Sequence, residues 1–219
     1  MRLAVSLLSF LSITATAAPF AVQVGDTRLG LDAPPGFADT TSTGSPRLQE
    51  LAESLTSASN RILMFAVTDA DLRRFTLGDP LEAKRYMIAV TPRGLERERI
   101  TPGAFAAFVN DSLRALGAPP PALTADFRKY LDTQQGGSAL LAELRRDPEA
   151  VSVLRGARLP SENRFDTPKY MLTTTTLLLI RGKAINLGVF GAYDSLDDLD
   201  WIRAITARWI DELQRLNPR

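Results

Sequence analysis

The chain has 219 residues with neither histidine nor cysteine, which excludes Ser-His-Asp triads, thiol catalysis, thiolate metal sites and disulfides. Its 26 basic and 25 acidic residues nearly cancel, which argues against a binder of nucleic acid or of anionic membrane surfaces. Neither a G-x-x-x-x-G-K-[ST] loop nor a G-x-G-x-x-G loop is present, so the common phosphate-binding motifs are also excluded.

The N-terminus predicts a secretion signal. Arg2 supplies a positive charge, Leu3 to Ile13 form an apolar segment of about 11 residues, and Ala15-Thr16-Ala17 places small residues before a cleavage site. A membrane-spanning helix needs about 20 apolar residues, so an uncleaved anchor is the weaker alternative. We therefore expect cleavage after Ala17 and a soluble mature chain, residues 18–219, that forms a single domain.

Composition favours a bacterial periplasm as the compartment. Arginine far outnumbers lysine and alanine is abundant, as in proteins from GC-rich bacteria. Without cysteine, the mature protein carries no lipid anchor, and packing alone holds its fold in an oxidising compartment. Removal of Arg2 with the leader leaves 25 basic against 25 acidic residues.

The first half of the mature chain predicts a hairpin, a short helix and two buried strands. Alternating residues around Gly25-Asp26 indicate the hairpin, and continuous apolar runs indicate the strands. Residues 69–81 contain Gly78-Asp79-Pro80 and predict a loop, with room for one helical turn. The expected elements are strands at 20–24, 27–31, 61–68 and 86–91 and a helix marked by Leu48, Leu51, Ala52 and Leu55.

The next helix has clear signals at both ends. Thr101-Pro102 provides a cap and a proline at the first helical position, and Gly117 is a suitable stop. Its apolar stripe consists of Phe105, Phe108, Val109, Leu113 and Leu116. Weaker patterns predict helices at 122–132 and 138–146 and a strand at 151–154.

Residues 170–216 predict a strand, a turn at Arg181-Gly182-Lys183, a second strand and a long amphipathic helix. The run Leu177-Leu178-Leu179-Ile180 indicates a strand covered on both faces. Ser195 and Asp198 have the spacing of a capping box at the start of the helix. The stripe of this helix is Leu199, Ile202, Ile205, Trp209, Leu213 and Leu216.

Successive strands without intervening helices favour antiparallel pairing. The predicted fold is therefore α+β, with a mostly antiparallel sheet of about six strands sandwiched between helices in an αβα arrangement. We expect the C-terminal helix to cover one face and the helix of residues 102–116 to cover the other.

This arrangement resembles the PsbP-like family. The segment Leu31-Asp32-Ala33-Pro34-Pro35-Gly36-Phe37 is similar to the family's strand followed by Pro-Gly-aromatic, and the chain ends, like the family, with a hairpin and a long Trp-containing helix. The family includes photosystem accessory subunits, a Ran-binding protein and many exported bacterial proteins. The resemblance implies a binding or assembly role and supplies no catalytic residues.

Two acidic clusters are candidate sites. Asp194, Asp197, Asp198 and Asp200 offer oxygen ligands for calcium, but they lack the order of a calcium loop, and acids at the start of a helix also complement its dipole. Asp69-Ala70-Asp71 is a D-x-D pair of the kind that holds a metal-bound nucleotide sugar, although it also suits a polar exit from a strand. We favour the structural interpretation of both clusters and predict no cofactor.

The remaining candidates are Thr173 to Thr176 and two tryptophans. Threonines on alternate faces of a strand can line a groove, but they are also good strand formers. Trp209 belongs to the apolar stripe of the last helix and is expected in the core. Trp201 either packs against the sheet or is exposed to a partner.

These observations favour an exported, non-enzymatic binding or accessory protein whose partner is an envelope protein or a small ligand. The alternative is a carboxylate-dependent hydrolase acting on cell-envelope glycans, since two acidic residues suffice for that chemistry. A purely structural subunit is a third possibility and requires an oligomer.

Overall fold

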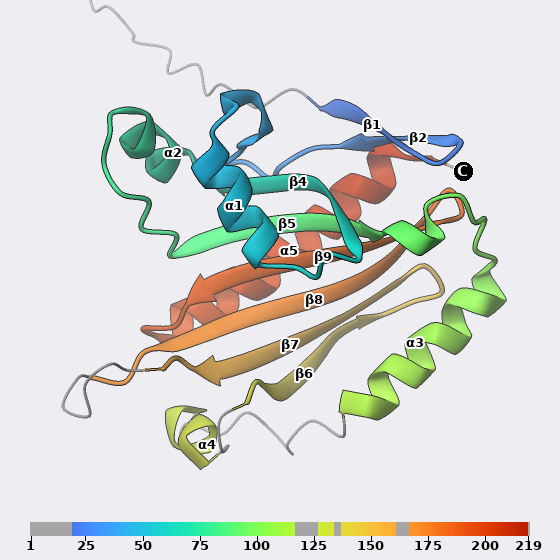
Figure 1. Ribbon diagram of the computed structural model, residues 1–219. Helices are drawn as coiled ribbons and strands as arrows, with labels where there is room; N and C mark the ends of the chain where they lie inside the picture. Colours follow the sequence, from blue (N-terminus) through green and yellow to red (C-terminus); the bar gives the residue numbers. More distant parts are fainter. Residues whose placement is uncertain (1–18, 117–126, 134–136, 161–166, 219) are drawn as a thin grey trace, which may run out of the picture.

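A seven-stranded antiparallel sheet runs through the middle of the protein (Figure 1). The computed structural model describes residues 19–116, 127–133, 137–160 and 167–218. Across the sheet the strands follow the order β3-β4-β5-β9-β8-β7-β6, while β1 and β2 form a separate hairpin that contacts the C-terminal helix. The predicted α+β class with an antiparallel sheet is confirmed, and the sheet has one strand more than the expected six.

The strand bounds follow the predicted apolar runs closely in most cases. The strands are Phe20–Val24 (β1), Thr27–Leu31 (β2), Phe37–Asp39 (β3), Asn60–Thr68 (β4), Arg85–Pro92 (β5), Ala139–Arg146 (β6), Ala150–Arg158 (β7), Tyr170–Ile180 (β8) and Lys183–Ala192 (β9). The α-helices are Pro46–Ser54 (α1), Asp69–Thr76 (α2), Pro102–Leu116 (α3), Phe127–Thr133 (α4) and Leu196–Leu216 (α5), with short 3₁₀ turns at Thr41–Thr43 and Arg93–Leu95.

Helices lie on both faces of the sheet, as the predicted αβα arrangement requires. In Figure 1, α5 lies behind the sheet, while α1 and α3 lie in front of it. The main core forms between the sheet and α5, because the stripe of α5 from Leu199 to Leu213 is buried there. Leu131 of α4 belongs to the same core. Two smaller clusters form on the front face, one under α1 and α2 and one under α3.

The hairpin of β8 and β9 closes through two residues, Arg181 and Gly182, with φ of +50° and +78°. Positive φ at both central positions gives the turn the twist of the strands it connects. From this turn β8 and β9 remain paired over ten residues each, Met171 to Ile180 against Lys183 to Ala192. The predicted coverage of both faces holds at Leu178, Leu179 and Ile180, whereas Leu177 is half-exposed.

Two predicted elements were wrong. Residues 138–146 were expected to be helical, but Ala139–Arg146 forms the edge strand β6. Its leucine- and alanine-rich sequence favours a helix locally, and pairing with β7 overrides that preference. Residues 69–81 were expected to be a loop with room for one helical turn, but they begin with the eight-residue helix α2, whose first turn is capped by the Thr68 hydroxyl accepting from the Asp71 N–H.

Other differences are smaller. Phe37 begins the three-residue strand β3 and is buried. Phe108, placed in the stripe of α3, is 49% exposed, because α3 contacts the sheet mainly through Phe105 and Val109. The predicted leader, residues 1–17, lies outside the described residues, as do the helix stop at Gly117 and residues 122–126 of a predicted helix.

Candidate functional site

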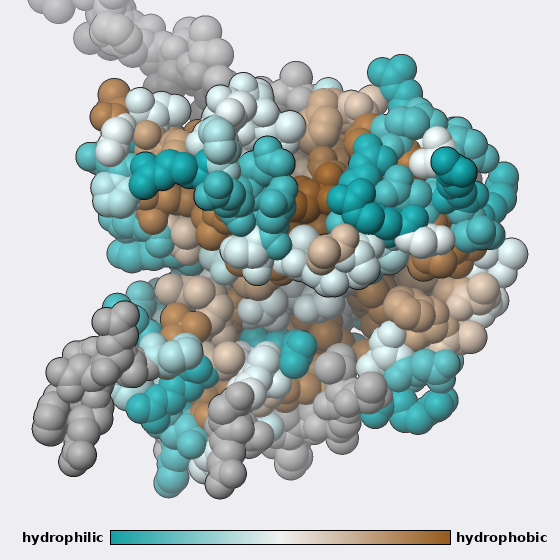
Figure 2. All heavy atoms as spheres, in the orientation of Figure 1, coloured by the Kyte–Doolittle hydropathy of each residue, from teal (hydrophilic) through white to brown (hydrophobic). Residues whose placement is uncertain are grey.

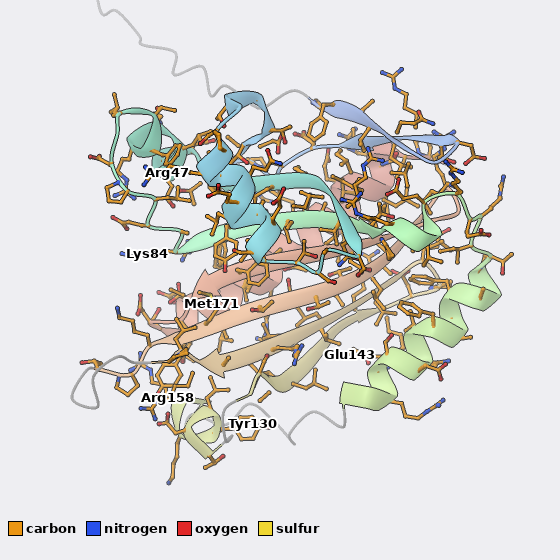
Figure 3. The ribbon with its side chains drawn as sticks, in the orientation of Figure 1. Arg47, Lys84, Tyr130, Glu143, Arg158 and Met171 are labelled. Atoms are coloured by element: carbon orange, nitrogen blue, oxygen red, sulfur yellow. The ribbon has the colours of Figure 1, made fainter. Side chains whose placement is uncertain are left out.

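The two acidic clusters meet at one end of the sheet, in a hollow of about 270 Å³. Lys84, labelled in Figure 3, lies at this end, where β5 begins. The charged side chains that line the hollow are the acids Asp71, Glu82, Asp194 and Asp198 and the cations Arg74, Lys84 and Arg85. Folding therefore brings together acids that are more than a hundred residues apart, and it places cations between them.

Asp198 acts as the cap of α5. One carboxylate oxygen accepts the backbone N–H groups of Asp194 and Ser195, both at 2.9 Å, and the other accepts from Arg85 Nη2 at 2.8 Å. Burial alone would raise the pKa of Asp198, but these hydrogen bonds and the guanidinium outweigh it and hold the pKa below its ordinary value. The helix-cap interpretation is confirmed for Asp198, while Asp197 and Asp200 are exposed near the same helix start.

The D-x-D pair also has a structural role. Asp71 is 4% exposed, and its carboxylate accepts from Arg74 Nη2 at 2.5 Å. The Arg74 guanidinium also pairs with Glu82, with Nη1 at 2.8 Å from Oε1. Asp69 and Asp71 lie in the first turn of α2, where acids complement the helix dipole. Within the described ranges, no group of three or more acidic side chains is arranged to hold a metal ion.

Replacing Asp198 by alanine is expected to lower the free energy of unfolding by about 1–2 kcal/mol, because two N–H groups lose their acceptor. Since the folded pKa is below the unfolded value, the contribution of Asp198 is present above the unfolded pKa and disappears as pH falls through the folded pKa. Denaturant titrations at neutral and strongly acidic pH measure this. Asp197→Ala is the control, and equal losses in both variants would contradict the capping role.

The four threonines of β8 divide between the faces of the sheet. Thr174 and Thr176 are fully buried toward α5, where Thr174 bonds the Thr206 hydroxyl and Thr176 donates to Ser152, both at 2.8 Å. Thr175 is exposed and Thr173 half-exposed on the front face. The strand-forming interpretation therefore accounts for one pair, and the other pair is available to line a groove.

None of the described helices covers the central part of the front face. Along β9, the side chains from Lys183 to Gly191 that face α5 are all buried, whereas Asn186, Gly188 and Phe190 on the front are half-exposed. In Figure 1, the middle parts of β8 and β9 pass between α1 and α3, and α3 packs on β8 only near its end at Leu179. Figure 2 shows this face hollowed along its middle. We call Tyr86, Thr173, Thr175, Gly188 and Phe190 the open band.

An aromatic pair occupies one side of the open band. The rings of Tyr86 and Phe190 are stacked, with centroids 4.6 Å apart and planes inclined by 13°. A Cβ atom at Gly188 would lie 2.9 Å from the Phe190 ring, so the glycine lets that ring lie close to the strand. Partial burial raises the pKa of Tyr86, so its hydroxyl is protonated at neutral pH. Both rings remain half-exposed and available for contact.

A second hollow, of about 350 Å³, lies beside the open band between α3 and the strands β6 and β7. Glu143, labelled in Figure 3, belongs to its wall together with Leu113 of α3. Leu140 and Val153 form part of its floor. Both are neighbours of Arg155 on the same face of the sheet, because Leu140 pairs with Arg155 and Val153 lies two residues before it.

A third hollow, of about 610 Å³, lies between α1 and the first half of β4. The strand β3 covers β4 only from Ala66 to Thr68, and Asp39 and Thr40 extend that cover to the Phe65 backbone. The walls combine buried Leu48 and Phe65 with exposed polar residues. Its charged lining residues are the exposed Glu53 and Arg93, and its lining contains no stacked aromatic pair of the kind found in the open band.

Both tryptophans pack within the fold. Trp209 is fully buried, and its indole N–H donates to the Asp32 carbonyl oxygen at 2.9 Å, as expected for a core residue. Trp201 stacks on Phe37 with centroids 6.3 Å apart, and Arg85 lies 4.1 Å above its ring. Of the two interpretations of Trp201, the structure supports packing against the sheet.

Comparison with known proteins identifies no family. No family model matches the chain, and no curated protein matches it in sequence. Among solved structures, it is similar to the Ran-binding protein Mog1p of Saccharomyces cerevisiae, with 10% identity and a TM-score of 0.39 over 91% of this chain and 92% of that one. A similarity of this degree assigns neither a function nor a partner to the chain.

Sequence reasoning did not find the open band or Arg155. The acids stood out because they are clustered in the sequence, whereas the open band draws residues from β5, β8 and β9. One local signal was present: in Asn186 to Phe190, the branched apolar residues Leu187 and Val189 alternate with Asn, Gly and Phe. That period of two indicates a strand with one fully buried face and one partly exposed face.

Proposed function

We propose that the protein is an exported, non-enzymatic binding protein that holds a small ligand on the open band. The observation that carries this proposal is the contrast along β9, buried on the α5 face and half-exposed on the other, with a stacked aromatic pair on the exposed side. Exposed aromatic surface in a concave region is typical of binding sites. The predicted leader, residues 1–17, supports export to the periplasm.

The resemblance to the PsbP-like family also supports a binding or accessory role, and it rests on residues 31–37 and on the final hairpin and helix. In the part of the chain that the structure describes, no helix is both long enough and apolar enough to cross a membrane.

The alternative, a hydrolase of envelope glycans, has less support. Its general acid needs a raised pKa. Burial raises the pKa of Asp39, but this carboxylate accepts the Thr41 hydroxyl and the Phe65 N–H, which gives it a structural role at the end of β3. Asp71 and Asp198 are paired with arginines.

The test compares the wild-type protein with Thr175→Trp, which fills the open band at an exposed position. After release from the periplasm, native mass spectrometry of the wild type is expected to show a bound small molecule that the variant lacks. Thr76→Trp, at an exposed position on α2, is the control and should retain the ligand. Retention of the protein in the cytoplasm, absence of any ligand, or turnover of envelope glycans would contradict the proposal.

A further inference from the structure

Arg155 is the arginine of the outer strands that has no acidic partner within the described residues. Strands β6 and β7 carry four arginines, and three of them are ion-paired: Arg145 with Asp147 and Asp211, Arg146 with Glu143, and Arg158 with Asp132. In the described residues, Arg155 makes one hydrogen bond, from Nη2 to the Ser138 carbonyl oxygen at 3.2 Å.

The guanidinium of Arg155 therefore has unused donors. Its Nε is buried and has no hydrogen-bond partner among the described residues. A buried donor without a partner is destabilising, so such groups usually have an acceptor, and a bound molecule can supply one here. Glu143, which pairs with Val153 on the same face, is held by Arg146, which lowers the Glu143 pKa and keeps that carboxylate occupied.

Strand pairing places Arg155 in line with the aromatic pair. Arg155 pairs with Thr173, Thr173 with Phe190, and Phe190 with Tyr86, so the four side chains form one row on the front face. Strands lie about 4.8 Å apart, so the backbones of Arg155 and Phe190 are separated by about 10 Å, with the Thr173 hydroxyl between them. One end of the row is cationic and the other is aromatic.

On the basis of the proposed binding function, we propose that this row binds a small aromatic carboxylic acid with a short chain between the ring and the acid group. The carboxylate pairs with the Arg155 guanidinium, which presents N–H donors suited to a carboxylate. The ring packs against the Phe190 and Tyr86 pair in an offset or edge-on contact. The hollow between α3 and β6–β7 accommodates substituents beyond Arg155.

The test uses 3-phenylpropionate as the probe in calorimetric titrations of the full mature protein at neutral pH. We expect 3-phenylpropionamide, which lacks the charge, and 3-cyclohexylpropionate, which lacks the aromatic ring, each to bind more weakly, the amide by about tenfold. Arg155→Gln is expected to weaken binding of the acid by about tenfold and to make the acid and the amide nearly equal. These ligand comparisons need no variant, so they remain decisive if Arg155→Gln is unstable.

Arg158→Gln is the matched control, because Arg158 lies on the same strand, is paired with Asp132 and is labelled in Figure 3 near α4. It removes the same charge and should leave the affinity for the acid unchanged. Equal affinity for acid and amide, an unchanged affinity in Arg155→Gln, or absence of binding at millimolar acid would each overturn the proposed ligand class. If the protein binds a molecule of another class and Thr175→Trp displaces that molecule, the proposed ligand class is wrong, whereas the proposed binding function is supported.

Discussion

Replacing Lys183 by methionine is expected to lower the free energy of unfolding by about 3 kcal/mol. The Lys183 side chain is 1% exposed, and its ammonium group donates to the carbonyl oxygens of Glu96 and Glu98, both at 3.0 Å, and pairs with Asp26 at 2.9 Å. Methionine has a similar length but no donors, so both carbonyl groups would lose their partner. Equilibrium denaturation by urea measures the loss.

The variant Asp26→Asn removes the ion pair of Lys183 and leaves its two carbonyl contacts in place, so it measures the ion pair alone. The Asp26 side chain is 83% exposed, so water replaces the lysine readily when the pair is lost. The hydrogen bond from Lys183 holds the pKa of Asp26 below its ordinary value, which is the direction expected for an exposed acid beside a cation. We expect a much smaller effect than for Lys183→Met. Similar losses in the two variants would contradict the dominance of the carbonyl contacts.

Trp209→Ala is expected to cost about 3–5 kcal/mol, since it removes the largest fully buried side chain of the core. The indole fills the space between α5 and the sheet and also bonds the Asp32 carbonyl oxygen. Trp209→Phe keeps much of the packing and loses the hydrogen bond, so its cost should be clearly lower.

Thermal and urea unfolding of the two Trp209 variants test this order. An exposed aromatic residue provides the comparison: Phe108→Ala on α3 removes a ring that is 49% exposed and should change stability little. If Phe108→Ala lowered the free energy of unfolding as much as Trp209→Ala, the side of α3 that carries Phe108 would have to be covered in the folded protein.

The final hairpin and helix could be predicted from the sequence because their signals are local. Three signals are involved: the two-residue turn at Arg181-Gly182, the period of two in β9 and the apolar stripe of α5. Each of them is formed by residues that are close together in the sequence. Strand β6 could not be predicted, because Ala139–Arg146 has good helix formers and becomes a strand only by pairing with β7. The N-terminal capping of α2 by Thr68 was a local signal that the following Gly78 and Pro80 obscured.

The same contrast between local signals and pairing of distant segments applies to the candidate site. The cluster from Asp194 to Asp200 was identified correctly as helix-start acids from its position, and Asp198 is used in that way. Asp69 and Asp71 were interpreted as a polar exit from a strand, but they lie in the first turn of α2. The open band depends on which strands are neighbours, since it requires β5, β9 and β8 to lie in that order, and Arg155 joins its row only because β7 lies next to β8. The sequence of each strand alone does not indicate that Arg155 and Phe190 share a face, so the site emerged only from the register of the sheet.

The most direct test of the binding proposal is an amide NMR spectrum of the isotopically labelled mature protein, recorded with and without a concentrated small-molecule fraction of a periplasmic extract. The proposal predicts shifts confined to the open band, with Thr173, Thr175, Gly188 and Phe190 affected and Asp71 and Asp198 unchanged. Shifts confined to the charged hollow around Asp71 and Asp198, or no shifts at all, would contradict it.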